Sequence, residues 1–189
     1  MNLKRRPQMI DPGTALVFSI DFQDKILAAV EDRDEVIAQA ASFIRVARMA
    51  DIPVLRLEQN PDRLGPTTDL VREALGDSQV YSKMTFSALR TPEVESAVRA
   101  LRRDQFILLG VEAHICVAQT ALDAVAMGYE VYVLQDASSS VKAFDRKLAM
   151  ERMRQAGAVI TTAQAAAFEM VGAAGTPLFR QAQPVLKNL

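Results

Sequence analysis

The sequence predicts an α/β fold in which a mostly parallel, six-stranded sheet carries helices on both faces. Short apolar runs, which are typical of buried parallel strands, alternate along the 189 residues with segments of helical periodicity. Strands that alternate with helices form parallel sheets through right-handed crossovers, and these crossovers place helices on both faces. We therefore expect a three-layer αβα, Rossmann-like architecture.

Six apolar runs are the expected strands. They are short, and most of their side chains are Val, Ile, Leu, Phe or Tyr. In chain order they span residues 15–20, 53–57, 80–82, 106–109, 131–134 and 159–160.

Six segments around these runs are the expected helices. In the first, apolar residues recur with a spacing of three or four from Val36 to Ala47, which fits one buried face. Thr91 before Pro92 is typical of a helix cap followed by proline at the first helical position, and Gly128 ends an Ala-rich segment. The six helices are expected at residues 34–50, 67–75, 92–102, 115–127, 142–155 and 164–171.

Size and composition favour one domain and exclude some classes of partner. Half of the residues are hydrophobic, so we expect residues 1–189 to form a single domain with a core at about 14–171. The tail, residues 172–189, is expected to wrap the domain or a partner subunit. Twenty-two basic and 23 acidic side chains leave a net charge of −1, which provides no electrostatic footprint for nucleic acid or an anionic membrane.

The terminus and the cysteine content predict a cytoplasmic protein. A basic cluster at residues 4–6 is followed by Pro7 and not by an apolar signal segment, so we expect a solvated arm. No apolar run approaches the length that spans a membrane. Cys116 is the only cysteine, which cannot form an internal disulfide and fits a reducing compartment.

Three reactive side chains follow expected strands. Asp21 follows the first strand, Lys83 the third and Cys116 the fourth. Ligands bind at the carboxyl ends of parallel strands, so we expect these side chains to converge on one edge of the sheet. A thiol can attack a carbonyl carbon while a carboxylate carries the proton and a lysine holds the carboxylate in place. The set predicts acyl chemistry on a small molecule.

Cys116 has the most favourable position for a nucleophile. In the first turn of the expected helix at residues 115–127, free N–H groups and the helix dipole favour the thiolate over the thiol. Each of the three residues also has a simpler interpretation. Cys116 could be a small core residue, Asp21 a helix cap and Lys83 an exposed surface lysine.

Three segments resemble the isochorismatase-like cysteine hydrolases, and most closely the isochorismatase domain-containing proteins. They are Asp21-Phe-Gln23, Tyr81-Ser-Lys-Met-Thr-Phe-Ser-Ala88 and Gly110-Val-Glu-Ala-His-Ile-Cys-Val-Ala-Gln-Thr-Ala-Leu-Asp-Ala-Val-Ala-Met-Gly128, and the resemblance extends from about residue 14 to 171. It implies Cys116 as nucleophile, Asp21 as general base and Lys83 as third member of the triad. It also implies an oxyanion hole from the N–H groups of Glu112 and Cys116, a cis peptide bond between Val111 and Glu112, and a homo-oligomer of two or more subunits.

Two departures from related enzymes narrow the expected reaction. Nicotinamidases of this superfamily carry a metal site with histidines after the second strand, whereas residues 57–61 contain none, so we expect no metal and no other cofactor. True isochorismatases need no cysteine nucleophile. The presence of Cys116 therefore favours hydrolysis of an amide, carbamoyl or related C–N bond.

Four further residues are expected to bind substrate: Phe22, Gln23, Phe86 and His114. Aromatic residues at strand ends are also common in cores, and His114 could be structural. Gln23 could orient either the substrate or Asp21. The Glu112 side chain could bind a cationic substrate group or pair with an arginine at an interface.

Two other classes of function compete with the hydrolase. A non-catalytic protein could use the same fold to bind a metabolite or a partner. A flavodoxin-like or nucleotide-binding domain is disfavoured, because no Gly-x-Gly-x-x-Gly follows the first strand and no Walker loop is present.

Overall fold

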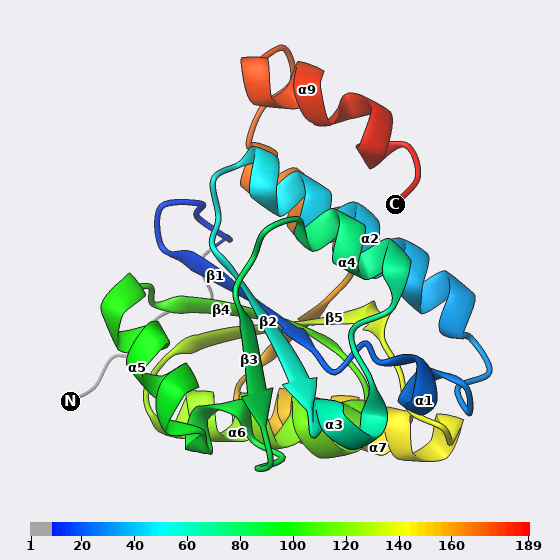
Figure 1. Cartoon of the computed structure of the whole chain (residues 1–189). Coiled ribbons are helices and arrows are strands. Elements are labelled where there is room, and N and C mark those ends of the chain that lie inside the picture. Colours follow the sequence, from blue (N-terminus) through cyan, green and yellow to red (C-terminus); the bar gives the residue numbers. More distant parts are fainter. Residues whose placement is uncertain (1–8) are drawn as a thin grey trace.

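A parallel six-stranded sheet forms the centre of the computed structural model, which describes residues 9–189 (Figure 1). The basic cluster expected to form a solvated arm lies outside the described residues. The strand order is β3-β2-β1-β4-β5-β6, and every neighbouring pair is parallel. The strands are β1 (Ala15–Ile20), β2 (Val54–Gln59), β3 (Val80–Lys83), β4 (Gln105–Gly110), β5 (Glu130–Ser138) and β6 (Val159–Thr161).

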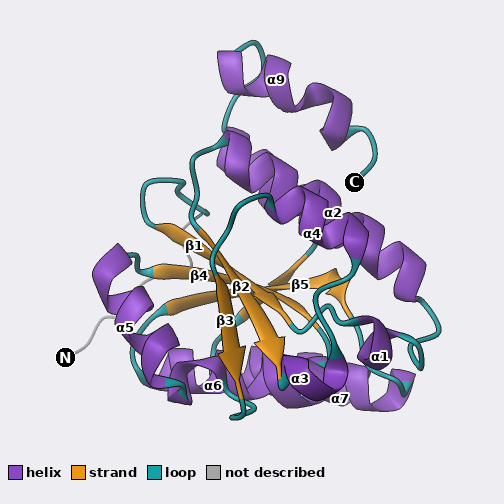
Figure 2. Cartoon of the chain, viewed as in Figure 1, coloured by secondary structure: helices purple, strands orange, loops and turns teal. Residues whose placement is uncertain are grey.

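Helices cover both faces of the sheet, so the expected three-layer architecture is confirmed (Figure 2). α2 and α4 lie over one face and α5, α6 and α7 over the other (Figure 1). The helices are α1 (Asp24–Leu27), α2 (Arg33–Met49), α3 (Pro61–Leu64), α4 (Asp69–Leu75), α5 (Pro92–Leu101), α6 (Ala118–Ala126), α7 (Ala143–Ala156), α8 (Ala163–Val171) and α9 (Pro177–Leu186), with a 3₁₀ turn η1 (Ala88–Arg90) and a π-helical turn η2 (Ala113–Val117).

The alternation of side chains along each central strand supplies two hydrophobic cores. In β1, Val17 packs in the core under α2, whereas Phe18 packs in the core under α6. In β4, Ile107 and Phe106 divide between the same two cores. Both faces of a central strand are buried, so apolar residues occupy successive positions along it. This is why β1 and β4 appear in the sequence as continuous hydrophobic runs.

Gly110 allows β4 to end against β1. Its φ is +143°, and a Cβ placed there would overlap the carbonyl oxygen of Ile20. Only glycine combines this backbone conformation with so close an approach. The strand order reverses between β1 and β4, so the segments that follow Ile20 and Gly110 flank the switch point where open α/β sheets bind ligands.

Three expected elements differ in detail from the structure. The helix expected at residues 115–127 begins as η2 and becomes regular only in α6, and β5 continues to Ser138, four residues beyond the expected end. The tail contains α9, which packs on α2 and α8 and buries Ala182 and Leu186. The tail therefore packs on this chain's own α/β core. No helix within residues 9–189 has both the length and the apolarity needed to cross a membrane.

Candidate active site

Asp21 and Lys83 form a buried ion pair at the carboxyl edge of the sheet. Lys83 Nζ lies 2.7 Å from Asp21 Oδ2, and neither side chain is exposed to solvent. Asp21 directly follows β1, and Lys83 is the last residue of β3, so β2 separates the strands that carry them. The interpretation of Lys83 as an exposed surface lysine is wrong, because a buried ammonium requires a partner of opposite charge.

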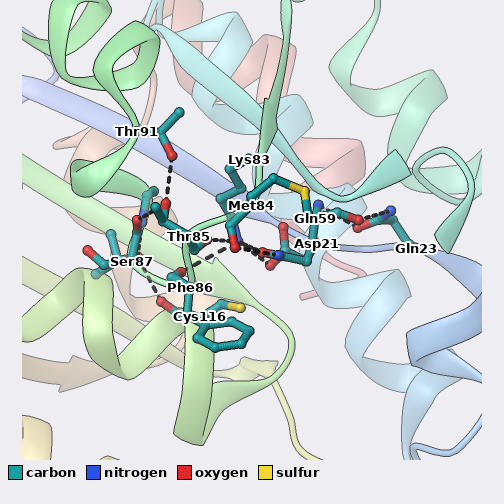
Figure 3. A network of polar contacts seen from close by, with 12 residues as sticks. Asp21, Gln23, Gln59, Lys83, Met84, Thr85, Phe86, Ser87, Thr91 and Cys116 are labelled. Atoms are coloured by element: carbon teal, nitrogen blue, oxygen red, sulfur yellow. Dashed lines mark hydrogen bonds and ion pairs between the residues drawn. The ribbon is translucent and has the colours of Figure 1, made fainter. Parts of the chain in front are cut away.

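Lys83 is held by several acceptors besides Asp21. Its ammonium donates to Gln59 Oε1 at 2.7 Å and to the carbonyl oxygens of Thr85 and Phe86 at 3.4 and 3.5 Å. Figure 3 shows this network, which also joins Gln59 to Gln23. The ammonium therefore has a fixed position. Gln59 belongs to the site although it was not predicted from the sequence. Its position at the end of β2 could have indicated it.

The backbone of Asp21 adopts an unusual conformation. Its φ is +55°, a left-handed value that non-glycine residues rarely adopt and that is enriched at functional sites. The helix cap of α1 is Gln23, so the interpretation of Asp21 as a helix cap is wrong. Burial raises the pKa of the Asp21 carboxyl above its ordinary value, and the Lys83 charge opposes that shift. Among the described residues, Asp21 Oδ1 has no hydrogen-bond partner by distance and angle.

Cys116 lies beside this pair in the turn η2 (Figure 3). Its side chain is buried, and the thiol interacts with Asp21, an interaction that contributes to the pKa of both groups. Burial, followed by the Asp21 charge, raises the pKa of the Cys116 thiol to about 12. The expectation that the thiolate is favoured is therefore wrong, because desolvation and the Asp21 charge outweigh the Lys83 charge.

The turn that carries Cys116 presents two backbone amides. The Val111–Glu112 peptide bond is cis, as the family resemblance implied. The N–H groups of Ala113, Ile115 and Val117 donate to carbonyl oxygens. In the described part of the chain, the N–H groups of Glu112 and Cys116 donate to no group outside η2. These two N–H groups are the candidates for binding an oxygen near the thiol, as the family resemblance implied.

The loop before α7 fixes the position of this turn. Ala113 N donates to the carbonyl oxygen of Ser139 at 2.7 Å, and Val141 N donates to Glu112 Oε2 at 3.1 Å. Thr120 fixes the other side: its hydroxyl donates to the carbonyl oxygen of Cys116 at 2.7 Å and accepts from Ala88 N at 3.0 Å. The nucleophile turn is therefore anchored from two neighbouring loops.

A small cavity of about 140 Å³ opens at Cys116. Phe86, which is 53% exposed, lines it as expected for a residue that binds substrate. The sequence analysis missed Ile26, Val111 and Ile115, which also belong to the lining together with Gln59, Glu112 and Cys116. Their apolar character alone did not distinguish them from core residues. A larger cavity of about 720 Å³ lies along α7 and is lined by none of the expected site residues.

Three of the four residues expected to bind substrate lie elsewhere. Phe22 is buried in the core under α2. Gln23 is buried, and its amide exchanges hydrogen bonds with backbone groups of Gln59 and Gly65, so it positions the loop after β1. His114 does not line the cavity; its Nδ1 lies 3.0 Å from Ser140 Oγ. Substrate contact by these three residues stays a prediction that the lining of this cavity does not support, because burial and hydrogen-bond partners cannot be inferred from spacing.

A second buried network supports the same edge. Glu58 Oε1 accepts from Arg56 at 2.7 and 3.0 Å and from both the N–H and the hydroxyl of Thr67 at 2.8 and 2.7 Å. Burial alone raises the pKa of Glu58, but the hydrogen bonds from Thr67 and Arg56 outweigh it and hold the pKa below its ordinary value. Thr67 pairs with Gln23, so this network positions the loop that carries Asp21. Among residues 9–189, no group of three or more His, Cys, Asp or Glu side chains is arranged to hold a metal ion.

Comparisons with known proteins show the family of this chain. A family model described as the isochorismatase domain matches residues 14–165. Isochorismatase domain-containing protein 2 of Bos taurus is 37% identical over 178 residues, which cover 94% of this chain and 85% of that protein.

Two solved structures have the same fold. The MAR1 ribonuclease of Caenorhabditis elegans is 34% identical with a TM-score of 0.89, over 94% of this chain and 92% of that one. Escherichia coli YcaC, described as an octameric hydrolase of unknown specificity, is 26% identical with a TM-score of 0.87, over 97% and 95% of the two chains.

Proposed function

Because the chain belongs to the isochorismatase family, we propose that it is a hydrolase. The bond that it cleaves is a C–N bond of a small amide or carbamoyl compound. The reaction passes through a covalent intermediate on Cys116. The observation that carries this proposal is the group formed by the Cys116 thiol, the Asp21 carboxyl and the Lys83 ammonium. The reaction needs no cofactor.

The first half of the reaction forms an acyl-enzyme. Asp21 takes the proton from the thiol as sulfur attacks the carbonyl carbon, so a C–S bond forms while the C=O π electrons move to oxygen. The N–H groups of Glu112 and Cys116 donate to this oxyanion. The C–N bond then breaks, the carbonyl re-forms, and the leaving nitrogen takes the proton from Asp21. A thioester and an amine or ammonia result.

The second half returns the enzyme to its starting state. Water attacks the thioester carbonyl and gives a proton to Asp21, the C–S bond breaks, and the sulfur takes that proton back. The sum is amide plus water to carboxylic acid plus amine. Lys83 neither gives nor takes a proton in this scheme; it holds the Asp21 carboxylate and favours its charged form.

The raised pKa of Cys116 gives a physical role to Asp21. A thiol with a pKa of about 12 is protonated at neutral pH, so attack requires a base in contact with it. Asp21 is that base, and burial raises the pKa of its carboxyl and thus makes it a better proton acceptor.

The experiment that tests the proposal measures ammonia released from a panel of primary amides, including acetamide, propionamide, butyramide and benzamide. We expect turnover by the wild type and its loss in Cys116→Ala, together with normal folding of the variant. Full turnover by Cys116→Ala would overturn the assignment of the nucleophile.

One observation favours a second candidate, a non-catalytic protein that binds a metabolite in the same cavity. A thiol whose pKa is raised to about 12 is not activated in the absence of ligand. In that case no amide of the panel would be hydrolysed, and wild type and Cys116→Ala would bind the same compounds with equal affinity.

Hydrolysis of RNA, the activity for which the Caenorhabditis elegans relative is named, is not the function that we propose. A cavity of about 140 Å³ lined by Glu112, Gln59, Cys116 and four apolar residues provides no cation for a phosphodiester. We expect no cleavage of single-stranded RNA by the purified protein, measured by gel electrophoresis with a known ribonuclease as positive control.

We also propose a cytoplasmic homo-oligomer. YcaC is described as octameric, and Phe144 and Leu148 on α7 are large apolar side chains that are 68% and 47% exposed. Light scattering after gel filtration tests the assembly: a mass of one subunit at micromolar concentration would contradict it.

A further inference from the structure

The cavity at Cys116 is small and mostly apolar. Ile26, Phe86, Val111 and Ile115 contribute hydrocarbon to its lining. Its volume, about 140 Å³, is close to that of an engineered protein cavity of about 150 Å³ that holds benzene. The part of an acyl group that lies inside this cavity therefore has at most about the size of a benzene ring.

The polar side chain of Gln59 is neutral and already engaged on both of its polar atoms. Its Oε1 accepts from Lys83 at 2.7 Å, and its Nε2 donates to the carbonyl oxygen of Met84 at 3.0 Å. The nearby Lys83 ammonium is paired with Asp21 and is completely shielded from solvent. Gln59 is neutral and the Lys83 charge is already paired, so neither residue provides a free counter-ion for an anionic substrate.

Glu112 supplies the remaining charge in the lining. Its Oε2 accepts from Val141 N, while its Oε1 makes no hydrogen bond within residues 9–189. Its side chain is 21% exposed, and the nearest basic group is His114 Nδ1 at 3.7 Å. No arginine of the described chain pairs with it. Both oxygen atoms are acceptors, so this residue favours neutral or donor-bearing groups and repels anions.

We propose that the site selects small, apolar, uncharged acyl groups and that Glu112 excludes anionic ones. This specificity rests on the proposed function, since it concerns the same thiol and the same cavity. Carboxylate-bearing metabolites, which need a cation to offset their desolvation, are poor substrates at such a site. Primary amides of short aliphatic or aromatic acids have the chemistry that fits.

The test uses two alkylating reagents that differ in charge. Iodoacetamide is neutral and iodoacetate is an anion of nearly equal size. Cys116 is the only cysteine, so the mass of the peptide that contains it reports the reaction at this thiol separately from reaction at amines elsewhere. Rates are measured at about pH 9.5, where enough thiolate is present. The same protein unfolded in urea gives the reference ratio of the two rates.

We expect the ratio of the iodoacetamide rate to the iodoacetate rate to be at least about tenfold higher in the folded wild type than in the unfolded reference. In Glu112→Gln, which keeps an acceptor for Val141 N, most of that preference is lost. Asp145→Asn is the matched control, because this carboxylate lies 3.9 Å from His114 Nε2 but is not part of the cavity lining. It should keep the wild-type ratio.

Three results would overturn the inference: a folded ratio equal to the unfolded one, an unchanged preference in Glu112→Gln, or an iodoacetamide rate that stays far below that of the unfolded protein after correction for the thiolate fraction at each pH. The last result would show that the cavity does not admit a neutral acyl group. Failure of the proposed function is recognised separately, by amide hydrolysis that persists in Cys116→Ala. If the folded protein prefers iodoacetamide and Cys116→Ala still hydrolyses amides, the selectivity of the cavity is supported and the catalytic role of the thiol is overturned.

Discussion

Lys83 Nζ lies 2.7 Å from Asp21 Oδ2, and both side chains are completely shielded from solvent. The pair joins the ends of two strands that are not neighbours in the sheet, and it has Cys116 beside it. Each charge is tolerated in the interior only because the other is present. The stability of the protein and the catalysis that we propose therefore depend on the same contact.

Removal of one charge from this pair should destabilise the protein more than removal of both. Asp21→Asn leaves a buried ammonium with neutral acceptors only, and we expect a loss of about 3–5 kcal/mol in the free energy of unfolding. The double variant Asp21→Asn with Lys83→Met should recover part of that loss. Urea unfolding of the two single variants and the double variant measures the coupling. Additive losses would contradict a coupled pair.

The pH dependence of Cys116 alkylation should follow its raised pKa. With a pKa of about 12, the rate in the wild type should rise about tenfold per pH unit through pH 9 and 10, without the plateau that a free thiol shows above about 8.5. The Asp21 charge contributes to this shift, so Asp21→Asn should react faster at neutral pH although it loses turnover. A plateau near pH 8.5 in the wild type would contradict the burial of the thiol.

The same shift has a consequence for stability in alkali. The thiol of the unfolded chain loses its proton near pH 8.5, whereas that of the folded protein keeps it to about 12. The folded state therefore binds more protons in this window, and its free energy of unfolding should fall as the pH rises through it. Cys116→Ala should lack this part of the decline, as measured by urea unfolding at several pH values.

Gly110 should tolerate no side chain. In Gly110→Ala the new Cβ overlaps the carbonyl oxygen of Ile20, and we expect a loss of at least about 3 kcal/mol in the free energy of unfolding. Gly128→Ala is the matched control, since Gly128 also has a positive φ of +91° but no neighbouring atom within 4 Å of the added Cβ. Its loss should stay at about 1–2 kcal/mol, the cost of the backbone conformation alone. Equal losses in denaturant unfolding would rule out the steric explanation.

Gln23 should act on the site through the backbone that it holds. Gln23→Leu leaves the N–H and the carbonyl of Gln59 and the carbonyl of Gly65 without their buried partner, at a cost of about 1–3 kcal/mol for each unsatisfied group. We expect lower kcat as well as lower stability, because Gln59 also binds Lys83. Gln164→Leu, at an exposed position, is the control and should change stability by less than about 0.5 kcal/mol. Unchanged kcat in Gln23→Leu would contradict its positioning role.

The fold and the three reactive residues could be predicted from the sequence because their signals are local. Buried parallel strands are continuously apolar, as in Phe106 to Leu109, and the residue after a strand lies at the ligand-binding edge wherever that strand stands in the sheet. The family resemblance then assigned roles to Asp21, Lys83 and Cys116.

The remainder of the site depends on packing, which spacing does not contain. Phe22 and Phe86 are both aromatic residues near strand ends, yet one is 1% and the other 53% exposed. The helix-start position of Cys116 predicted a thiolate, but desolvation by the surrounding side chains raises its pKa. Both outcomes depend on neighbours that are distant in sequence.

The measurement that tests the central claim most directly is the intact mass of the protein quenched in acid during turnover of a hydrolysed amide. The account predicts an adduct equal to the acyl group minus one hydrogen, located on Cys116 by peptide mapping, and absent from Cys116→Ala, which also releases no ammonia. Turnover by the wild type without any adduct, together with turnover by Cys116→Ala, would contradict nucleophilic catalysis by this thiol.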